Sequence, residues 1–220
     1  METNYTYKPL KTISKWSITL IVLCLLFSVA AVIGSLVEWS TYSQYSGNDQ
    51  MEDLTPSDLT TISAITVGIH LPKTFFFIVS LIVFLVWIYR AHANGRALQL
   101  DGTIYTPGWS AAFYLIPIVN IVLPLLSLLH LHKGGVKRAN SVQKEQIQSK
   151  VWMIYTWWVL YWSSYLLSIP NGISETDAVL SDIQGEIPSL IFSEILYFAA
   201  GIFLIFVIKN VTAVQERAAS

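Results

Sequence analysis

The stretch that decides the fold class is Trp16–Val37, WSITLIVLCLLFSVAAVIGSLV, in which 22 successive residues carry no charged side chain. A helix needs about 20 mostly apolar residues to cross the hydrocarbon core of a bilayer. The stretch is long enough, and Lys8, Lys11 and Lys15 precede it, as is typical of a cytoplasmic flank. We therefore predict a membrane-spanning helix here.

Three further apolar runs are of comparable length, and each predicts a spanning helix. They are Pro72–Tyr89, Trp152–Ile169 and Pro188–Ile208. The composition agrees, since 12% of the 220 residues are charged, whereas soluble domains carry roughly 25%. We expect a single all-α membrane domain over residues 1–220, with the lipid bilayer as a partner.

The distribution of Lys and Arg predicts the orientation, because these residues are retained on the cytoplasmic side. Segments 38–71 and 170–187 contain acids but no Lys or Arg. Segment 133–150 is strongly basic, and segment 90–108 contains Arg90 and Arg96. The pattern predicts cytoplasmic N- and C-termini and two in–out–in helical hairpins. The expected location is the cytoplasmic (inner) membrane of a bacterium.

One apolar segment, Trp109–Leu129, has basic flanks at both ends and therefore does not fit a simple crossing. Pro117 and Pro124 interrupt it, and each removes a helical hydrogen bond. Irregular backbone at membrane depth is tolerated only where protein or a wet cavity shields it. We predict a re-entrant segment that enters and leaves on the cytoplasmic side, cradled by the four spanning helices. A Pro-kinked fifth span is the alternative.

Both predicted outer loops contain a helix-start signal. Thr55-Pro56-Ser57-Asp58 is typical of an N-cap, with Pro at the first helical position and an acid in the first turn. Ser174 and Asp177 form a similar pair. Each signal predicts a short helix, followed by a spanning helix that starts at Pro72 or Pro188.

Polar and aromatic residues near the predicted inner face form one candidate cluster. Arg90 and Asn94 are four residues apart and share a helix face, so with Asn120 they could hold the re-entrant tip. A structural role is favoured over ligand binding. Trp87, Trp109 and Arg96 are expected to anchor the chain at the interface.

A second candidate is the pair Lys73 and Glu194. Glu194 is the one acid inside a predicted span, and Lys73 lies at a similar outer depth. Ionisable groups inside a membrane are candidates for function. A structural ion pair, or simple extension of the side chains to the outer interface, is the favoured interpretation.

Signals for other chemistry are weak. The sequence contains no metalloprotease, hydrolase or phosphate-loop motif, so we expect no enzyme and no cofactor. His130 and His132 are two residues apart, do not share a helix face and predict no metal site, even with His92 nearby. The net charge of −1 indicates no nucleic-acid partner. Cys24, the single cysteine, is expected to be a small buried side chain.

The central stretch carries a specific string of residues. It runs Arg90-Ala91-His92-Ala93-Asn94, then Pro107-Gly108-Trp109, then Phe113-Tyr114-Leu115-Ile116-Pro117-Ile118-Val119-Asn120 and Pro124. This string resembles a widespread bacterial family of small multi-helix membrane proteins of unknown function. The resemblance covers about the central quarter of the chain and implies a membrane location but no activity. Leu123 departs from the pattern, since a basic residue is expected before Pro124 in many relatives.

These observations favour a non-enzymatic membrane protein, an accessory or scaffold component that contacts another membrane protein, lipid or a second copy of itself. Aromatic residues crowd Trp152–Ile169, and Ile154, Trp158, Tyr161 and Tyr165 share one helix face that could pack in the core or on a partner. The alternative is a small oligomeric transporter or channel, which the broken segment and Glu194 would suit.

Overall fold

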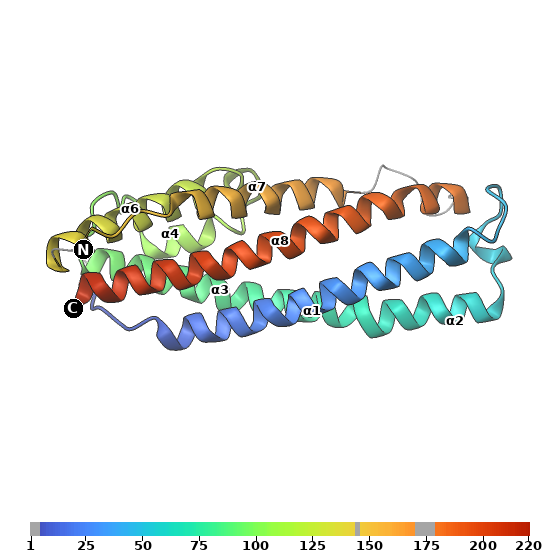
Figure 1. Ribbon diagram of the computed structural model, residues 1–220, viewed down its shortest axis with the longest axis horizontal. Helices are drawn as coiled ribbons and strands as arrows, with labels where there is room; N and C mark the ends of the chain where they lie inside the picture. Colours follow the sequence, from blue (N-terminus) through green and yellow to red (C-terminus); the bar gives the residue numbers. More distant parts are fainter. Residues whose placement is uncertain (1–4, 144–145, 170–178) are drawn as a thin grey trace. The chain divides into compact units, whose positions relative to one another are not determined.

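The computed structural model describes residues 5–143, 146–169 and 179–220, and within them the chain forms helices joined by turns, with no strand (Figure 1). In chain order the elements are α1 (Lys11–Tyr42), the 3-10 turn η1 (Met51–Asp53), α2 (Pro56–Ile65), the π-helical turn η2 (Thr66–His70), α3 (Leu71–Ala97), α4 (Pro107–Ala112), α5 (Pro117–Asn120), α6 (Leu123–Gln143), α7 (Val151–Leu167) and α8 (Leu180–Ala219).

Three helices of the described chain are long and apolar enough to cross a membrane. They are α1, α8 and the continuous helix Pro56–Ala97, which joins α2, η2 and α3. The helix α7 has 17 residues and is therefore about 26 Å long, a little less than the hydrocarbon core of about 30 Å. The chain is thus an all-helical protein with the hallmarks of a membrane protein.

The predicted helix start at Pro188 is wrong. The α3 helix begins at Leu71, one residue before the predicted start at Pro72, but it continues without a break from the helix that begins at Pro56. Pro188 is internal to α8, which already begins at Leu180. The π-helical turn Thr66–His70 lies just before Pro72. Its hydrogen bonds span five residues instead of four, and Pro72 itself has no N–H to donate. Both helices continue through their prolines, which the local rule for proline does not foresee.

The predicted cap at Thr55 is present. The Thr55 hydroxyl accepts a hydrogen bond from the backbone N–H of Asp58, and Pro56 is the first residue of α2. The second predicted cap, at Ser174 and Asp177, lies outside the described residues.

The described chain packs as two compact units. Unit 1 comprises Met1–Ile21, Ile78–Trp158 and Ile202–Ser220, and unit 2 comprises Val22–Phe77 and Val159–Gly201. The helices α1, α3, α7 and α8 each contribute residues to both units.

Unit 1 is held together by buried residues from α3 and α8. Trp87, Ile88, Ala91 and Ile208 are each 0% exposed. The Trp87 indole donates to the Thr212 hydroxyl over 3.3 Å, so a polar bond supplements this apolar contact.

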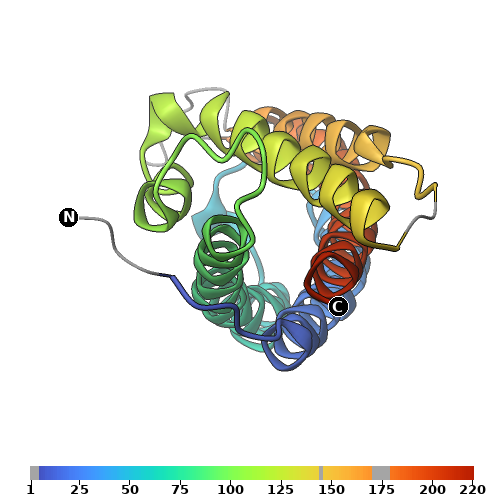
Figure 2. The ribbon, with the colours of Figure 1, turned by 90° about the vertical axis from the view of Figure 1, so that its left-hand side faces the viewer.

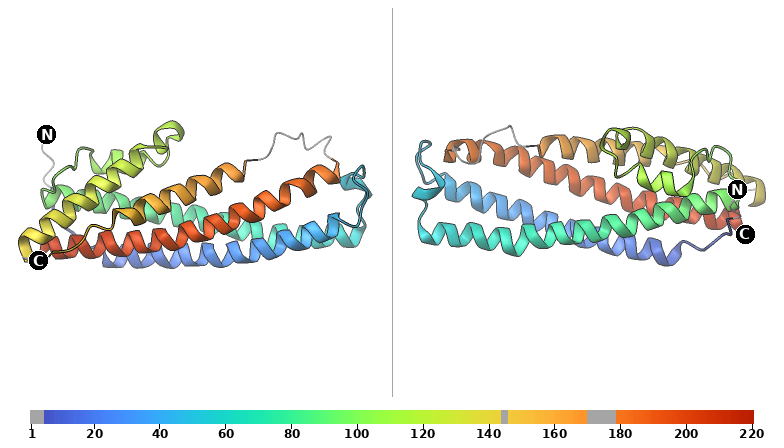
Figure 3. Two further views of the ribbon diagram at one scale, coloured as in Figure 1. Left: turned by 45° about the horizontal axis from the view of Figure 1, so that its top comes forward. Right: turned by 180° about the vertical axis from the view of Figure 1, so that it is seen from behind.

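A helical hairpin forms one side of unit 1. The helices α4 and α6 contact each other, and the chain bends back between them over residues 113–122 (Figures 2 and 3). The bend coincides with the predicted interruption, because α5 starts at Pro117 and α6 at the residue before Pro124. The described segment is therefore broken and turns back along itself.

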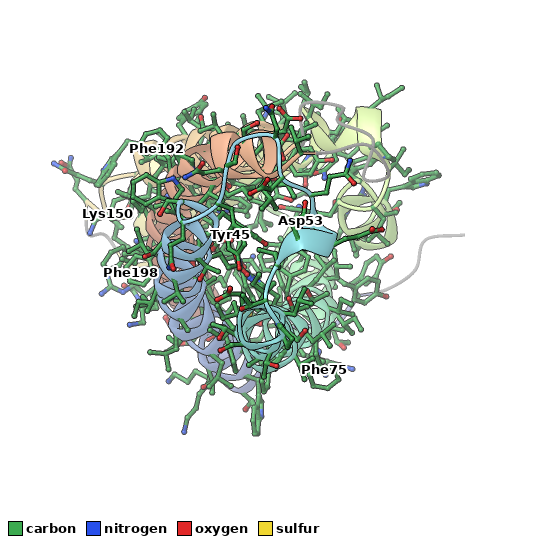
Figure 4. The ribbon with its side chains drawn as sticks, turned by 90° about the vertical axis from the view of Figure 1, so that its right-hand side faces the viewer. Tyr45, Asp53, Phe75, Lys150, Phe192 and Phe198 are labelled. Carbon is green, nitrogen blue, oxygen red and sulfur yellow. The ribbon has the colours of Figure 1, made fainter. Side chains whose placement is uncertain are left out.

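Unit 2 has its own buried cluster, formed by Tyr42, Leu54, Leu180 and Ile187. Phenylalanine side chains cover its outside, and Figure 4 shows Phe75 and Phe192 pointing away from the unit, where they are 62% and 53% exposed. An apolar exterior of this kind suits contact with lipid rather than water.

Candidate functional site

The main candidate site is a charged cluster in unit 2, where three helices meet. The Lys73 ammonium on α3 forms an ion pair with Oε1 of Glu194 on α8. The Ser28 hydroxyl on α1 donates to the other carboxylate oxygen, Oε2, over 2.6 Å. Both oxygens of the acid therefore have partners, and the structure brings together the two ionisable residues that the sequence singled out.

This cluster is largely shielded. The Lys73 and Glu194 side chains are 19% and 20% exposed. A lone charge in such a place would be costly, whereas a paired and hydrogen-bonded one is tolerated. Ser28 supplies the neutral donor and was not predicted as a site residue. The signal for it in the sequence was a hydroxyl side chain within the apolar run Trp16–Val37.

Close packing of α1 and α8 explains how Ser28 reaches Glu194. A Cβ atom added at Gly201 would lie 2.5 Å from Cδ2 of Leu25, closer than real Cβ contacts allow. Glycine at this position lets the two helices approach, and Ser28 lies one turn along α1 from Leu25.

Two open cavities flank the charged cluster within unit 2. One, of about 250 Å³, is lined by Ser28 and Glu194 together with apolar residues of α1 and α8. The other, of about 240 Å³, is lined by His70, Lys73, Thr74, Phe77 and Tyr197. The Lys73 ammonium lies 5.4 Å from the centre of the Tyr197 ring, a distance suited to a cation–π contact.

The second candidate cluster, in unit 1, is not assembled as expected. Asn94 is 1% exposed, and its amide bonds the backbone of Lys8 instead of Asn120. The Asn94 Oδ1 accepts from the Lys8 N–H over 2.9 Å, and its Nδ2 donates to the Lys8 carbonyl over 2.8 Å. Arg90 is exposed, and Asn120 Oδ1 is buried without a hydrogen-bond partner among the described residues.

The predicted interfacial anchors have different roles. Trp87 is fully buried and bonds Thr212, so its prediction as an anchor is wrong, since the face of α3 that bears it packs inward. Trp109 is 57% exposed, and its role as an interfacial anchor stays a prediction. Arg96 donates from Nη2 to the Ile104 carbonyl over 3.0 Å and so supports the turn between α3 and α4.

Several buried polar residues of unit 1 were not foreseen. His92 donates from Nδ1 to the Ile88 carbonyl, because a carbonyl can only accept, and its Nε2 therefore accepts from the Ser127 hydroxyl over 2.8 Å. Gln215 Nε2 donates to the Ala91 carbonyl over 2.8 Å. The three-residue spacing of Thr212 and Gln215 on α8 was a usable signal.

The chain reverses between α3 and α4 at Gln99 and Gly102, whose φ angles are 51° and 82°. Pro107 and Gly108 belong to the first turn of α4, which Thr106 caps. Positive φ favours glycine, so Gly102 was the informative residue.

Metal ligands do not converge in the part of the chain that the structure describes, where no group of three or more His, Cys, Asp or Glu side chains is close enough to hold an ion. His130 and His132 project from α6 in different environments. His130 is partly exposed, whereas His132 is 1% exposed.

The comparisons with known proteins identify a family but no activity. Residues 50–213 match a family model described as a domain of unknown function (DUF4328). No curated protein and no solved structure matches the chain.

Proposed function

The chain belongs to the DUF4328 family of unknown function, and we propose that it is a non-enzymatic integral membrane protein. Its proposed role is that of an accessory or scaffold component that contacts another membrane protein or lipid. The proposed location is the bacterial cytoplasmic membrane, with both termini in the cytoplasm.

The proposed topology has four crossings and one re-entrant hairpin. Helices α1, Pro56–Ala97 and α8 have the length and hydropathy of spanning helices. Helix α7 is the fourth crossing, because its 17 mostly apolar residues cover most of the hydrocarbon core and a bilayer thins locally around short helices. The positive-inside pattern of the loops supports this orientation.

The observation that carries the proposal is the complete pairing of Glu194 within unit 2. Lys73 takes one carboxylate oxygen and Ser28 takes the other, so the cluster joins α1, α3 and α8. An acid engaged in this way stabilises a helix junction. A transport site, by contrast, needs polar groups that exchange their partners as the substrate passes.

Mild detergent extraction of the full chain from its native membrane tests the proposal. We expect a stable complex with another membrane protein or with specific lipids, identified by mass spectrometry, and no ion flux from the purified chain in liposomes. A self-assembled ring that conducts ions would overturn the accessory role.

A small oligomeric transporter or channel is the second candidate, and one local feature favours it. The π-helical turn Thr66–His70 ends three residues before Lys73, and π turns are frequent at functional sites. The cavity lined by His70 and Lys73 adjoins this turn. Flux in liposomes that Glu194→Gln abolishes, with the helical content and oligomeric state unchanged, would establish this alternative.

A further inference from the structure

We propose that a basic pocket at the base of the α4–α6 hairpin binds a phosphate group, that of an anionic phospholipid headgroup. The pocket lies within unit 1 and has a volume of about 210 Å³. Its lining residues are Asp101, Gly102, His130, Lys133, Gly134 and Lys137. It is separate from the Lys73–Glu194 cluster and shares no residue with it.

Two glycines create the pocket by letting the turn before α4 pack directly on α6. A Cβ atom at Gly134 would lie 2.4 Å from the carbonyl oxygen of Asp101, a distance that no side chain tolerates. Gly102 adopts a φ of 82°, which favours glycine. The turn is then fastened by an ion pair between Lys137 Nζ and Asp101 Oδ2 at 2.5 Å.

The charge of the pocket matches a phosphate diester. Lys137 and Asp101 offset each other, which leaves the exposed ammonium of Lys133 as the net charge of the lining. His130 also lines the pocket, and its Nδ1 has no hydrogen-bond partner in the described part of the chain. A phosphate diester carries one negative charge and accepts hydrogen bonds, so it complements an ammonium and an imidazole N–H.

The expected position of the pocket in the membrane favours a lipid over a soluble ligand. The hairpin bend carries exposed apolar side chains, and Ile118, Ile121 and Val122 are 85%, 51% and 51% exposed. From Leu123 to Lys133 the helix rises about 15 Å, which is half of a hydrocarbon core of about 30 Å. With the bend at the bilayer centre, Lys133 lies at the headgroup level. This step rests on the re-entrant hairpin of the proposed topology.

Basic pockets on the cytoplasmic side of membrane helices are suited to anionic headgroups, because the inner leaflet supplies them at high local concentration. A soluble phosphate ester has the same oxygens but no acyl chains that could contact the apolar side chains of the bend. The test therefore compares phosphatidylglycerol with inorganic phosphate and glycerol 3-phosphate.

The experiment uses the delipidated full chain in detergent and measures added phosphatidylglycerol and phosphatidylcholine by native mass spectrometry. Lys133→Gln removes the exposed charge of the pocket that has no ion-pair partner among the described residues, and the matched control Arg138→Gln removes an exposed charge on the same helix outside the pocket. We expect Lys133→Gln to weaken the preference for phosphatidylglycerol about fivefold and Arg138→Gln to change it by less than about twofold. Inorganic phosphate and glycerol 3-phosphate should not displace the lipid at equal concentration.

Three results would overturn the proposal. Equal losses of the phosphatidylglycerol preference in the two variants would show that the lipid is attracted by diffuse surface charge rather than bound in a pocket. An unchanged preference in Lys133→Gln would remove the pocket from lipid binding altogether. Displacement by either soluble phosphate at equal concentration would assign the pocket to a soluble ligand. None of these results bears on co-purification with another membrane protein, which tests the accessory role separately from lipid binding at this pocket.

Discussion

At the residue scale, the ion pair in unit 2 makes a direct prediction about stability. Glu194→Gln leaves the Lys73 ammonium in a shielded place without its counter-charge. Removing the partner of a buried charge lowers the free energy of unfolding by several kcal/mol, and the partial exposure of Lys73 reduces this cost to roughly 2 kcal/mol. We expect a loss of that size in the free energy of unfolding, measured by denaturant titration in detergent.

Two companion variants separate the charge from the hydrogen bond. Ser28→Ala removes only the neutral donor and should cost about 1 kcal/mol. Adding Lys73→Met to Glu194→Gln should restore part of the lost stability, since neither charge then lacks a partner. A double variant no more stable than Glu194→Gln alone would contradict the pairing.

Asn94 provides a second prediction at this scale. Its amide satisfies both the N–H and the carbonyl of Lys8, so Asn94→Leu leaves two backbone groups without partners. We expect a loss of about 1–3 kcal/mol and faster hydrogen exchange in residues 5–10. Asn120→Leu is the matched control and should be nearly neutral, because the Asn120 Oδ1 has no partner among the described residues.

The burial of His132 predicts that the stability of the folded protein depends on pH. This residue is 1% exposed, and burial lowers its pKa from the ordinary 6.5 to about 4. The pKa of His132 is lower in the folded state than in the unfolded state. Its contribution to the free energy of unfolding is therefore complete above pH 6.5 and is lost as the pH falls toward 4. We expect NMR of ring-labelled histidine to show a titration near pH 4 that His132→Gln removes. A midpoint near 6.5 for this resonance would contradict its burial.

At the scale of elements, the hairpin formed by α4, α5 and α6 decides how the central segment lies in the membrane. Single cysteines at Ile104 and Ser141, in a Cys24→Ala background, flank it on both sides. Both positions are exposed and can react with a reagent in solution. A membrane-impermeant thiol reagent should label both only from the cytoplasm. Labelling of either one from outside would establish a fifth span.

At the scale of the whole molecule, the distribution of charge predicts which ends of the helices face the cytoplasm. Asn48 lies in the acidic segment between α1 and α2, and Ala219 lies at the end of α8, both exposed. With Cys24 replaced by Ala, a cysteine at Asn48 should react in intact cells. A cysteine at Ala219 should react only after the membrane is permeabilised, and the reverse result would invert the proposed topology.

The amino-acid sequence alone was sufficient for features that depend on neighbouring residues. The membrane class follows from the length of uncharged runs such as Trp16–Val37, because the bilayer imposes that length directly. The cap at Thr55 and the break around Pro117 were also predictable. Each arises within one helical turn, where residue type alone decides which backbone donor is satisfied or missing.

Tertiary structure decided the features in which a side chain selects a partner far along the chain. Lys8 and Asn94 are 86 positions apart, and no spacing rule connects them. Trp87 turns inward and donates to Thr212 on α8, and the helices continue through Pro72 and Pro188. The basic pocket likewise exists only because Gly134 admits the carbonyl of Asp101. The physical reason is common to all four, since periodicity specifies a helix and its faces, whereas packing specifies which face meets which neighbour.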